Sequence, residues 1–309
     1  MSLTLFKNKK VVYVLMALLV CMWGFEYVAA KTALDQLKPI TLVFFKYLIA
    51  AITLFVIRFI QKRKLPLKRK HVLTLIVCSL FGEILYFWCE YSAMEYLQVS
   101  TISIILAFVP MVSIILEVFV NKRKPNAIIV SGIFVCIVGV ILVIGVDTAA
   151  LLSGSWIGYL LAFGAVLFWN GYNFVTEKLA GEYKAYDLTF MQLSCTVLLT
   201  LPYAIFNLPQ LEDVDIGTVG GVLYLGIVSA LIGFLIYVIG ISVLGPTPCA
   251  LYSNFLPITT AFFGWMFLGE TLIPMQLVGG VIVIASGAVV IWQKSKLDKT
   301  HEQLEQNKA

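Results

Sequence analysis

The stretch "VVYVLMALLVCMWGFEYVAAKTA", residues 11–33, is long enough to cross a lipid bilayer as one helix. At a rise of about 1.5 Å per residue, roughly 20 apolar residues span the hydrocarbon core. The rest of the chain has the same character, with 61% hydrophobic and 13% charged residues. A typical soluble domain has about 25% charged residues. We therefore expect an integral membrane protein.

Apolar runs of this length recur from one end of the chain to the other. They lack the strict alternation of apolar and polar residues that marks the strands of a membrane β-barrel. The first run has no cleavage pattern of small residues, so we expect a permanent span rather than a signal peptide. The prediction is an all-α membrane protein with ten transmembrane helices, at residues 11–33, 41–60, 72–94, 99–120, 127–146, 156–176, 188–206, 218–244, 248–268 and 274–292.

Cysteine and histidine give no sign of a cofactor. All six cysteines fall inside the expected spans and none forms a C-x-x-C pair, which suits packing residues better than a metal site or disulfides. The two histidines, His71 and His301, lie in polar segments far apart in the sequence. We expect no metal, haem or other cofactor.

Basic residues predict the orientation of the chain. Short loops rich in Lys and Arg tend to stay in the cytoplasm, and such residues cluster before the first span, in 58–70, in "NKRKPN" (121–126) and after residue 292. We therefore expect a multi-pass protein of the plasma membrane with both termini and the polar tail 293–309 in the cytoplasm. The loop 62–70 serves as a topology signal, with a lipid or partner site as the alternative. The net charge of +5 needs no nucleic acid to explain it.

The sequence also repeats itself at a distance of 147 residues. Five spans fall in residues 11–146 and five in residues 156–292, and an odd number per half means that the second half enters the membrane from the other side. We expect two inverted five-helix repeats, an arrangement typical of carriers. The aligned landmarks are Gly24 with Gly171, Glu26 with Asn173, Lys31 with Lys178, and Pro110 with Pro257.

Four segments carry a family resemblance: "MWGFEYVAAK" (22–31), "PITLVFFKYLIAA" (39–51), "AMEYLQVSTISIILAFVP" (93–110) and "NFLPITTAFFGWMFLGETLIPMQLVGGVIVIASGAVVI" (254–291). In these segments the chain resembles the drug/metabolite transporter superfamily in its ten-span form with two EamA-type repeats. The resemblance implies secondary transport of small metabolites or drugs, often as export, through a central cavity between the repeats. The chain departs from the family pattern at Asn121-Lys122, where a Gly-Glu pair is usual, and at Lys46 and Gln192, where an arginine is common.

Ionisable residues inside the expected spans are the first candidates for a functional site. Glu26, Lys46, Glu83 and Glu90 each lie within an apolar run, where charge is costly unless it faces a cavity or a partner. Glu26 could bind a cationic group or exchange a proton, or it could be a structural partner of Lys46 or Lys31. Glu83 suits proton coupling or a hydrogen bond to a neighbouring helix. Glu90 lies nearer the external end of its span.

Aromatic and amide side chains extend this list of candidates. Aromatic faces could hold an apolar or cationic substrate, although packing is the ordinary role of such rings, and the amides could line a cavity or bond one helix to another. Pro110 and Pro257 each remove an intrahelical hydrogen bond, so we expect a kink or hinge at both. The further substrate-binding or coupling candidates are Trp23, Tyr27, Trp169, Asn170, Asn173 and Asn254.

These features together predict a secondary transporter that works by alternating access, most simply an exporter of amino acids, other metabolites or drug-like compounds. No phosphate-binding loop of the G-x-x-x-x-G-K-[ST] kind is present, so an ion or substrate gradient must drive it. A channel or sensor is the alternative. We expect no enzyme, because the spans hold neither aspartate nor an H-E-x-x-H motif. The expected partners are a small-molecule substrate and the bilayer, with proton coupling, in a monomer or weak homodimer.

Overall fold

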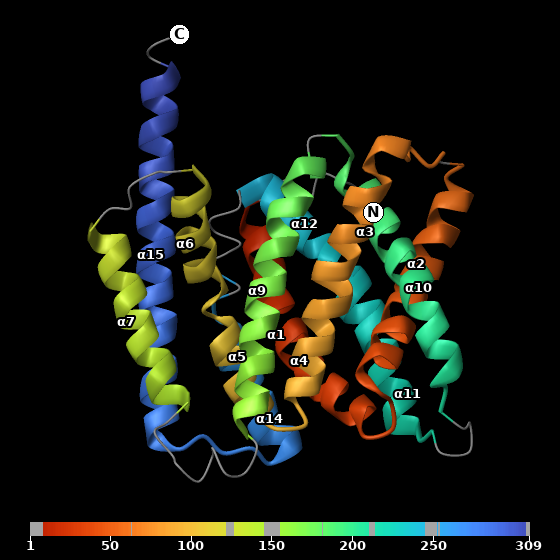
Figure 1. Ribbon diagram of the computed structural model, residues 1–309, viewed down its shortest axis with the longest axis horizontal. Helices are drawn as coiled ribbons and strands as arrows, with labels where there is room; N and C mark the ends of the chain where they lie inside the picture. Colours follow the sequence, from red (N-terminus) through yellow and green to blue (C-terminus); the bar gives the residue numbers. More distant parts are fainter. Residues whose placement is uncertain are drawn as a thin grey trace.

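The computed structural model describes residues 9–62, 64–121, 127–144, 155–180, 182–209, 214–244, 252 and 254–306. Regular structure in this part of the chain is helical throughout (Figure 1). The α-helices are α1 (Lys9–Leu34), α2 (Pro39–Ile60), α3 (Val72–Cys78), α4 (Tyr86–Ala93), α5 (Val99–Leu106), α6 (Val109–Asn121), α7 (Ala127–Ile144), α9 (Ser155–Ala180), α10 (Ala185–Phe206), α11 (Ile216–Leu223), α12 (Phe234–Leu244), α14 (Leu256–Leu268) and α15 (Pro274–Gln306).

Several of these helices have the length and composition of membrane spans. Among the described residues six segments qualify: Lys9–Leu34, Pro39–Ile60, Arg69–Ala93, Tyr186–Phe206, Ile216–Tyr237 and Pro274–Gln293. Shorter apolar helices cover Val99–Ser113, Ala127–Val143 and Leu256–Leu268. The predicted all-helical membrane protein is confirmed at this level. Residues 145–146 and 248–251 of two expected spans, and 122–126 of the basic loop, lie outside the described residues.

Two of the long segments contain a π-helical stretch. A short 3-10 turn, η2 (Arg69–His71), leads into α3, and η3 (Ser79–Leu85) then joins α3 to α4. In the same way η5 (Tyr224–Gly233) joins α11 to α12. Glycine occurs in both, at Gly82 and Gly226 among others, and no single apolar pattern distinguishes them from ordinary helix. Because π-helices are rare and concentrate at functional sites, these two stretches indicate where function is to be sought.

The two prolines aligned by the repeat both follow a turn and lie in the first turn of a helix. α5 ends at Leu106, residues 107–108 form a turn, and Pro110 is the second residue of α6. Pro257 is likewise the second residue of α14 and follows a turn at residues 254–255. Proline fits the first turn of a helix because its missing N–H would be unbonded there anyway. A turn therefore precedes each proline, whereas a kink or hinge motion at these places stays a prediction.

The Gly269-Glu270 pair has a clear structural role. Gly269 ends α14 in the left-handed conformation, at a φ of 66°, where glycine meets no steric penalty. The Glu270 carboxylate then accepts the backbone N–H of Val99 at 2.7 Å, and it also accepts the N–H and hydroxyl of Ser100. A carboxylate at a helix N-terminus satisfies free N–H groups and is stabilised by the helix dipole. This contact fixes the end of α14 to the start of α5.

The helices interleave rather than forming two separate bodies. α7 and α15 pair at one end of the molecule, where Gly139 and Gly279 allow close approach, and α2 packs on α10 at the other (Figure 1). α1 packs between α14 and the α11–η5–α12 segment, and α9 packs on the α3–η3–α4 segment. α2 contacts η5 while α10 contacts η3. Segments from residues 9–144 and from residues 155–306 are thus in direct contact through the middle of the bundle.

The last helix is longer than the tenth expected span. α15 runs from Pro274 without interruption to Gln306. The polar tail expected from residue 293 onwards is therefore helical as far as residue 306. In Figure 1 this helix projects beyond its neighbours at its C-terminal end.

Candidate functional site

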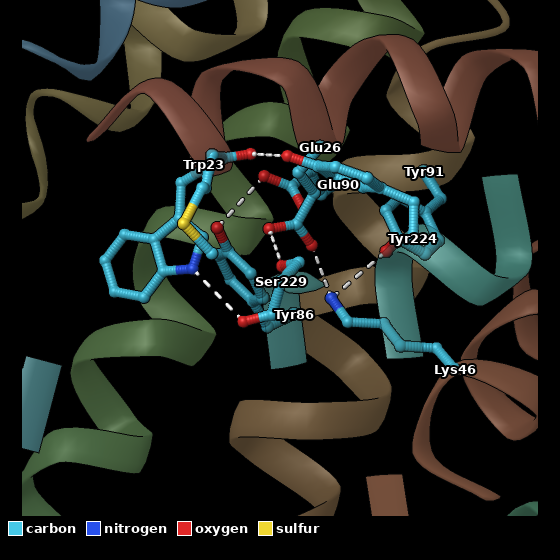
Figure 2. A network of polar contacts seen from close by, with 9 residues as sticks. Trp23, Glu26, Lys46, Tyr86, Glu90, Tyr91, Tyr224 and Ser229 are labelled. Carbon is cyan, nitrogen blue, oxygen red and sulfur yellow. Dashed lines mark hydrogen bonds and ion pairs between the residues drawn. The ribbon is translucent and has the colours of Figure 1, made fainter. Parts of the chain in front are cut away.

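A buried ion pair joins α1 to α2 in the interior of the bundle. Glu26 Oε1 lies 2.5 Å from Lys46 Nζ, and the two side chains are 13% and 2% exposed (Figure 2). Lys31, the other partner considered for Glu26, donates instead to the backbone carbonyl of Met94. The sequence left the partner of Glu26 open, and the structure assigns it to Lys46.

The second carboxylate oxygen of Glu26 is held by η5. Ser229 Oγ donates to Glu26 Oε2 at 2.5 Å, and the indole Nε1 of Trp23 donates to the backbone carbonyl of Ser229 at 3.4 Å. Nearby, the Tyr224 hydroxyl donates to the carbonyl of Met22 at 2.8 Å (Figure 2). Glu26 is therefore bonded at the same time to a residue of the first half and to one of the second half.

The Lys46 ammonium lies among aromatic rings. Its Nζ is 3.7 Å from the centroid of the Phe87 ring and 5.4 Å from that of Tyr47. The same Nζ donates to the hydroxyl of Tyr91 at 3.3 Å. Cation–π attraction grows when the cation is desolvated. Lys46 is therefore stabilised by a carboxylate, a hydroxyl and ring faces in a place that water barely reaches.

Two further carboxyl groups lie close to this ion pair. Glu90 accepts the Tyr86 hydroxyl at 3.0 Å and lies near Tyr27, while Glu83 in η3 lies near Tyr47. Both interact electrostatically with Lys46, but within the described part of the chain neither is within ion-pair distance of a cation. Three carboxyl groups therefore share one ammonium group. Such a group can take up protons or a cation, because unbalanced charge is costly in a membrane interior.

A second buried polar network lies between α9, α10 and the α3–η3 segment. Gln192 Nε2 donates to Thr176 Oγ1 at 3.3 Å, and the Tyr172 hydroxyl donates to Gln192 Oε1 at 3.5 Å. The Ser79 hydroxyl donates to the backbone carbonyl of Gln192 at 3.0 Å, and Thr176 lies 3.5 Å from the Cys78 thiol. We call this set the neutral network, and the Glu26–Lys46 set with its partners the charged network.

Comparison with known proteins identifies the kind of molecule to which these networks belong. The model of the EamA-like transporter family matches residues 10–145 and again residues 156–292. The chain belongs to the EamA-like transporter family. The predicted resemblance is confirmed, and the two matches coincide closely with the two halves expected from the sequence.

Individual relatives of this EamA-like transporter are distant but cover nearly its whole length. It is 23% identical to "Uncharacterized transporter YoaV" of Bacillus subtilis (strain 168), over 86% of this chain and 91% of the relative. It is 24% identical to "Probable amino-acid metabolite efflux pump" of Salmonella typhimurium (strain LT2), over 87% of this chain and 90% of that one. A solved structure described as "Crystal structure of protein" matches with a TM-score of 0.65 at 15% identity, covering 94% and 99% of the two chains. The last match supports the fold alone.

The EamA-like transporter brings six of the predicted site residues together. Trp23, Glu26, Tyr27, Lys46, Glu83 and Glu90 all belong to the charged network or contact it. Trp169 lies beside them, since its ring centroid is 4.9 Å from that of Tyr86. Glu90 is only 3% exposed and is not solvated, although it lies in the later part of its span.

The amide candidates and the prolines lie apart from the charged network. Asn170 donates to the carbonyls of Val109 and Val166, and Asn254 donates to the carbonyl of Ile284, which is the helix-bonding alternative considered for both. Asn173, aligned with Glu26 by the repeat, is exposed and does not join either network. Pro110 and Pro257 act on the helix path and contribute no group to the site.

Sequence reasoning missed Ser229 altogether. A single hydroxyl in an apolar run gives little signal, and the 147-residue register pairs Ser229 with Gly82, which hides its role. A search for polar residues near the middle of each span, rather than for charged ones alone, could have found it. Phe87 and Tyr47 were missed for a different reason: an aromatic that faces an ammonium has the same sequence signature as one that packs.

Proposed function

We propose that this protein is a secondary transporter that moves a small organic molecule by alternating access. The observation that carries the proposal is the bonding of Glu26 to Lys46 on one oxygen and to Ser229 on the other. Because these partners come from different halves of the chain, a movement of one half against the other would change what Glu26 binds. A carrier needs a site whose contacts differ between its two conformations.

The proposed architecture is ten spans arranged as two inverted five-helix repeats, residues 11–146 and 156–292. Paired features 147 residues apart support it. The π-helical stretches η3 and η5, and the turns before Pro110 and Pro257, fall at matching positions in the two halves. The helix contacts pair in the same way, since α2 meets η5 as α10 meets η3. Inverted repeats place a binding site near the middle of the bilayer, between the halves.

The proposed orientation has both termini and the helical tail in the cytoplasm of a cell whose plasma membrane holds the protein. The basic residues of the 62–70 loop support this side as cytoplasmic, because residues 62 and 64–70 are exposed and include several cations next to α2 and α3. The acidic side chain of Asp215 would then lie outside, at the start of α11.

The proposed direction is export, and the proposed energy source is a proton gradient. One relative is named an amino-acid metabolite efflux pump, which supports amino acids and related metabolites as the first compounds to test. Glu83 and Glu90 support proton coupling because they lie beside tyrosines and, within the described residues, neither is within ion-pair distance of a cation. Proton release on one side and uptake on the other would then accompany cargo movement.

Counterflow in proteoliposomes tests the carrier proposal. The purified protein is first screened by thermal shift against amino acids, amines, nucleosides and cationic drugs. Vesicles loaded with an unlabelled hit should then accumulate the labelled compound transiently, because a carrier exchanges cargo across the membrane. Equilibration without such accumulation would indicate a pore, and binding without flux would indicate a sensor.

Glutamine variants test the coupling part of the proposal. Glu83→Gln or Glu90→Gln should abolish transport driven by a pH gradient while counterflow persists, because Gln keeps the size and polarity of Glu but cannot carry a proton. Glu95→Gln is the matched control, since Glu95 lies at the exposed end of the same span. pH-driven transport that is unchanged in both test variants would rule out coupling through these groups.

A further inference from the structure

The Lys46 ammonium occupies a site that has every element of a binding site for a free amine. A carboxylate oxygen lies at 2.5 Å, a tyrosine hydroxyl at 3.3 Å and the centroid of a phenyl ring at 3.7 Å from Nζ. The Lys46 side chain is only 2% exposed. Proteins recognise ammonium ligands through this same combination of a carboxylate and aromatic faces.

A buried ion pair of this kind adds little to the net stability of the fold. Taking two charges out of water costs several kcal/mol per ion, and well-packed apolar residues in place of a buried pair are often as stable or more so. The neutral network joins the corresponding helices with uncharged groups, Gln192 and Thr176. The contacts between helices therefore do not require charge at Lys46.

The three carboxyl groups Glu26, Glu83 and Glu90 outnumber the single ammonium group of Lys46, so a second ammonium group can bind among them. Glu83 and Glu90 both attract Lys46 electrostatically, yet Lys46 pairs with Glu26. A lysine carries its charge on a flexible four-carbon stem, so Nζ can turn towards Glu83 or Glu90 when another cation takes its place. Two ammonium groups balance three carboxyl groups better than one does.

On the basis of the proposed transport function, we infer that the cargo carries a primary ammonium group and that the Lys46 ammonium is its tethered stand-in. In this account the cargo ammonium binds Glu26 Oε1 and the Phe87 ring when Lys46 moves away. Lys46 returns as the cargo leaves, which keeps Glu26 from remaining unpaired. No covalent step is involved. Lys46 thereby competes with cargo for one site.

The distances around Lys46 Nζ also indicate which class of ammonium group, primary or quaternary, the site favours. Nζ lies 3.7 Å from the Phe87 centroid, with the rings of Tyr47 and Tyr91 at 5.4 and 5.8 Å. An N-methyl group could not fit between the nitrogen and a ring at the shortest of these distances. Three hydrogen-bond donors also suit the carboxylate and the Tyr91 hydroxyl. The site should therefore favour primary ammonium over quaternary ammonium.

Removing the Lys46 side chain tests this inference about the cargo. Lys46→Ala deletes the atoms equivalent to n-propylammonium, so this compound should fill the space left behind. We expect its apparent affinity, measured by thermal shift of the purified full chain, to be at least tenfold higher in Lys46→Ala than in the wild type. Propyltrimethylammonium should show no gain. Lys38→Ala is the control, because Lys38 directly precedes the same helix and is exposed, bonded to Asn207.

A double variant separates site occupancy from a general effect of charge. Lys46→Ala/Glu26→Gln removes both partners of the ion pair and should lose the gain in affinity. Equal affinities in Lys46→Ala and the wild type, a gain that survives in the double variant, or an equal gain for the quaternary compound would each overturn the inference.

A measurement on the wild-type protein covers the case in which Lys46→Ala does not fold. Primary alkylammonium ions should compete with labelled cargo in counterflow, and their quaternary analogues should compete at least tenfold less well. Equal competition, or none, overturns the ammonium assignment while leaving the carrier proposal standing. Absence of counterflow with any compound overturns the carrier proposal itself, so the two failures are distinguishable.

Discussion

The charged and the neutral networks occupy corresponding places in the two halves of the chain. Lys46, Glu26 and Ser229 join α2, α1 and η5, whereas Gln192, Thr176 and Ser79 join α10, α9 and η3. Each network thus links two helices of one half to the π-helical stretch of the other. The same packing is achieved with charge in one place and without it in the other. Charge is therefore the feature that packing does not explain.

At two pairs of aligned positions, one π-helical stretch has serine where the other has glycine. Ser79 of η3 and Gly226 of η5 are 147 residues apart, and both lie against the second helix of the opposite half, α10 or α2. Gly82 and Ser229 are also 147 residues apart and meet α9 and α1. At these two aligned positions each stretch has one serine and one glycine, in the opposite order. The hydroxyl of η5 thus reaches Glu26, while that of η3 reaches a backbone carbonyl.

The largest expected effect is on the free energy of unfolding, which should fall more when the charged network is cut than when the neutral network is cut. Lys46→Ala should lower the free energy of unfolding by about 3–5 kcal/mol, because the Glu26 carboxylate is left buried without a cation. Gln192→Ala at the corresponding place should lower it by only about 1–3 kcal/mol, since the groups left unpaired are neutral. Equilibrium unfolding in mixed detergent micelles measures both. Equal losses would mean that the charges of the first network are solvated and the comparison is wrong.

The hydroxyls of the π-helical stretches give the next effect. Ser229→Ala removes a hydrogen bond to a carboxylate and should cost about 1.5–3 kcal/mol, whereas Ser79→Ala removes one to a backbone carbonyl and should cost about 0.5–1.5 kcal/mol. Ser229→Thr should recover most of the loss. A larger cost for Ser79→Ala would show that η5 is not the more strongly held stretch.

Much of the fold and part of the site could be predicted from the sequence. The length and apolar character of the runs predicted an all-helical membrane protein, and the isolated charges Glu26 and Lys46 indicated the interior of the bundle. What a repeat alignment could not predict was which side of a helix faces inward. Asn173 aligns with Glu26 but is exposed, while Thr176, three residues later on α9, makes the contact with Gln192.

The π-helical stretches were beyond prediction for a physical reason. Inserting one residue into a helical turn depends on what the neighbouring helices require, and apolar periodicity over a few turns does not report it. Ser229 contacts Glu26 from within such a stretch, so its position depends on a backbone feature that the sequence does not reveal. The charged residues were predictable because a membrane penalises them wherever they lie, whereas a serine carries no such penalty.

Glycine substitutions test how tightly the π-helical stretch η3 is packed, with a glycine of α11 that has open space around it as the comparison. A Cβ on Gly82 would lie 2.3 Å from the ring of Tyr172, whereas one on Gly220 in α11 would meet no atom within 4 Å. Gly82→Ala should therefore cost about 1–3 kcal/mol of stability through overpacking. Gly220→Ala should stabilise by up to about 1 kcal/mol, because alanine favours helix. Similar behaviour of the two variants in unfolding would show that η3 can shift freely.

The smallest expected effect comes from an ion pair that water does reach, and it tests whether burial is what makes the charged network strong. Lys68 Nζ lies 2.5 Å from Glu182 Oε2, and both side chains are exposed. The hydrogen bond and charge of Lys68 lower the pKa of Glu182, and those of Glu182 raise the pKa of Lys68. The pair links the basic loop to the segment between α9 and α10.

The signs of these shifts give the pH dependence. A carboxyl group whose pKa is lower in the folded state stabilises the fold above its ordinary value, about 4.3 for glutamate, and this contribution is lost as pH falls through the lowered pKa. The lysine contribution is present below about 10.4 and is lost as pH rises through the raised pKa. Glu182→Gln should therefore change the melting temperature only slightly near pH 7, because solvent screens an exposed pair. At a pH below the pKa of Glu182 in the folded protein, the variant and the wild type should have the same melting temperature.

Added salt should reduce the difference in stability between Glu182→Gln and the wild type near neutral pH, because salt screens exposed charges. The loss of stability in Lys46→Ala should stay almost unchanged, since salt screens buried pairs far less than exposed ones. A loss in Lys46→Ala that shrinks with salt as much as that in Glu182→Gln would contradict the burial of the charged network.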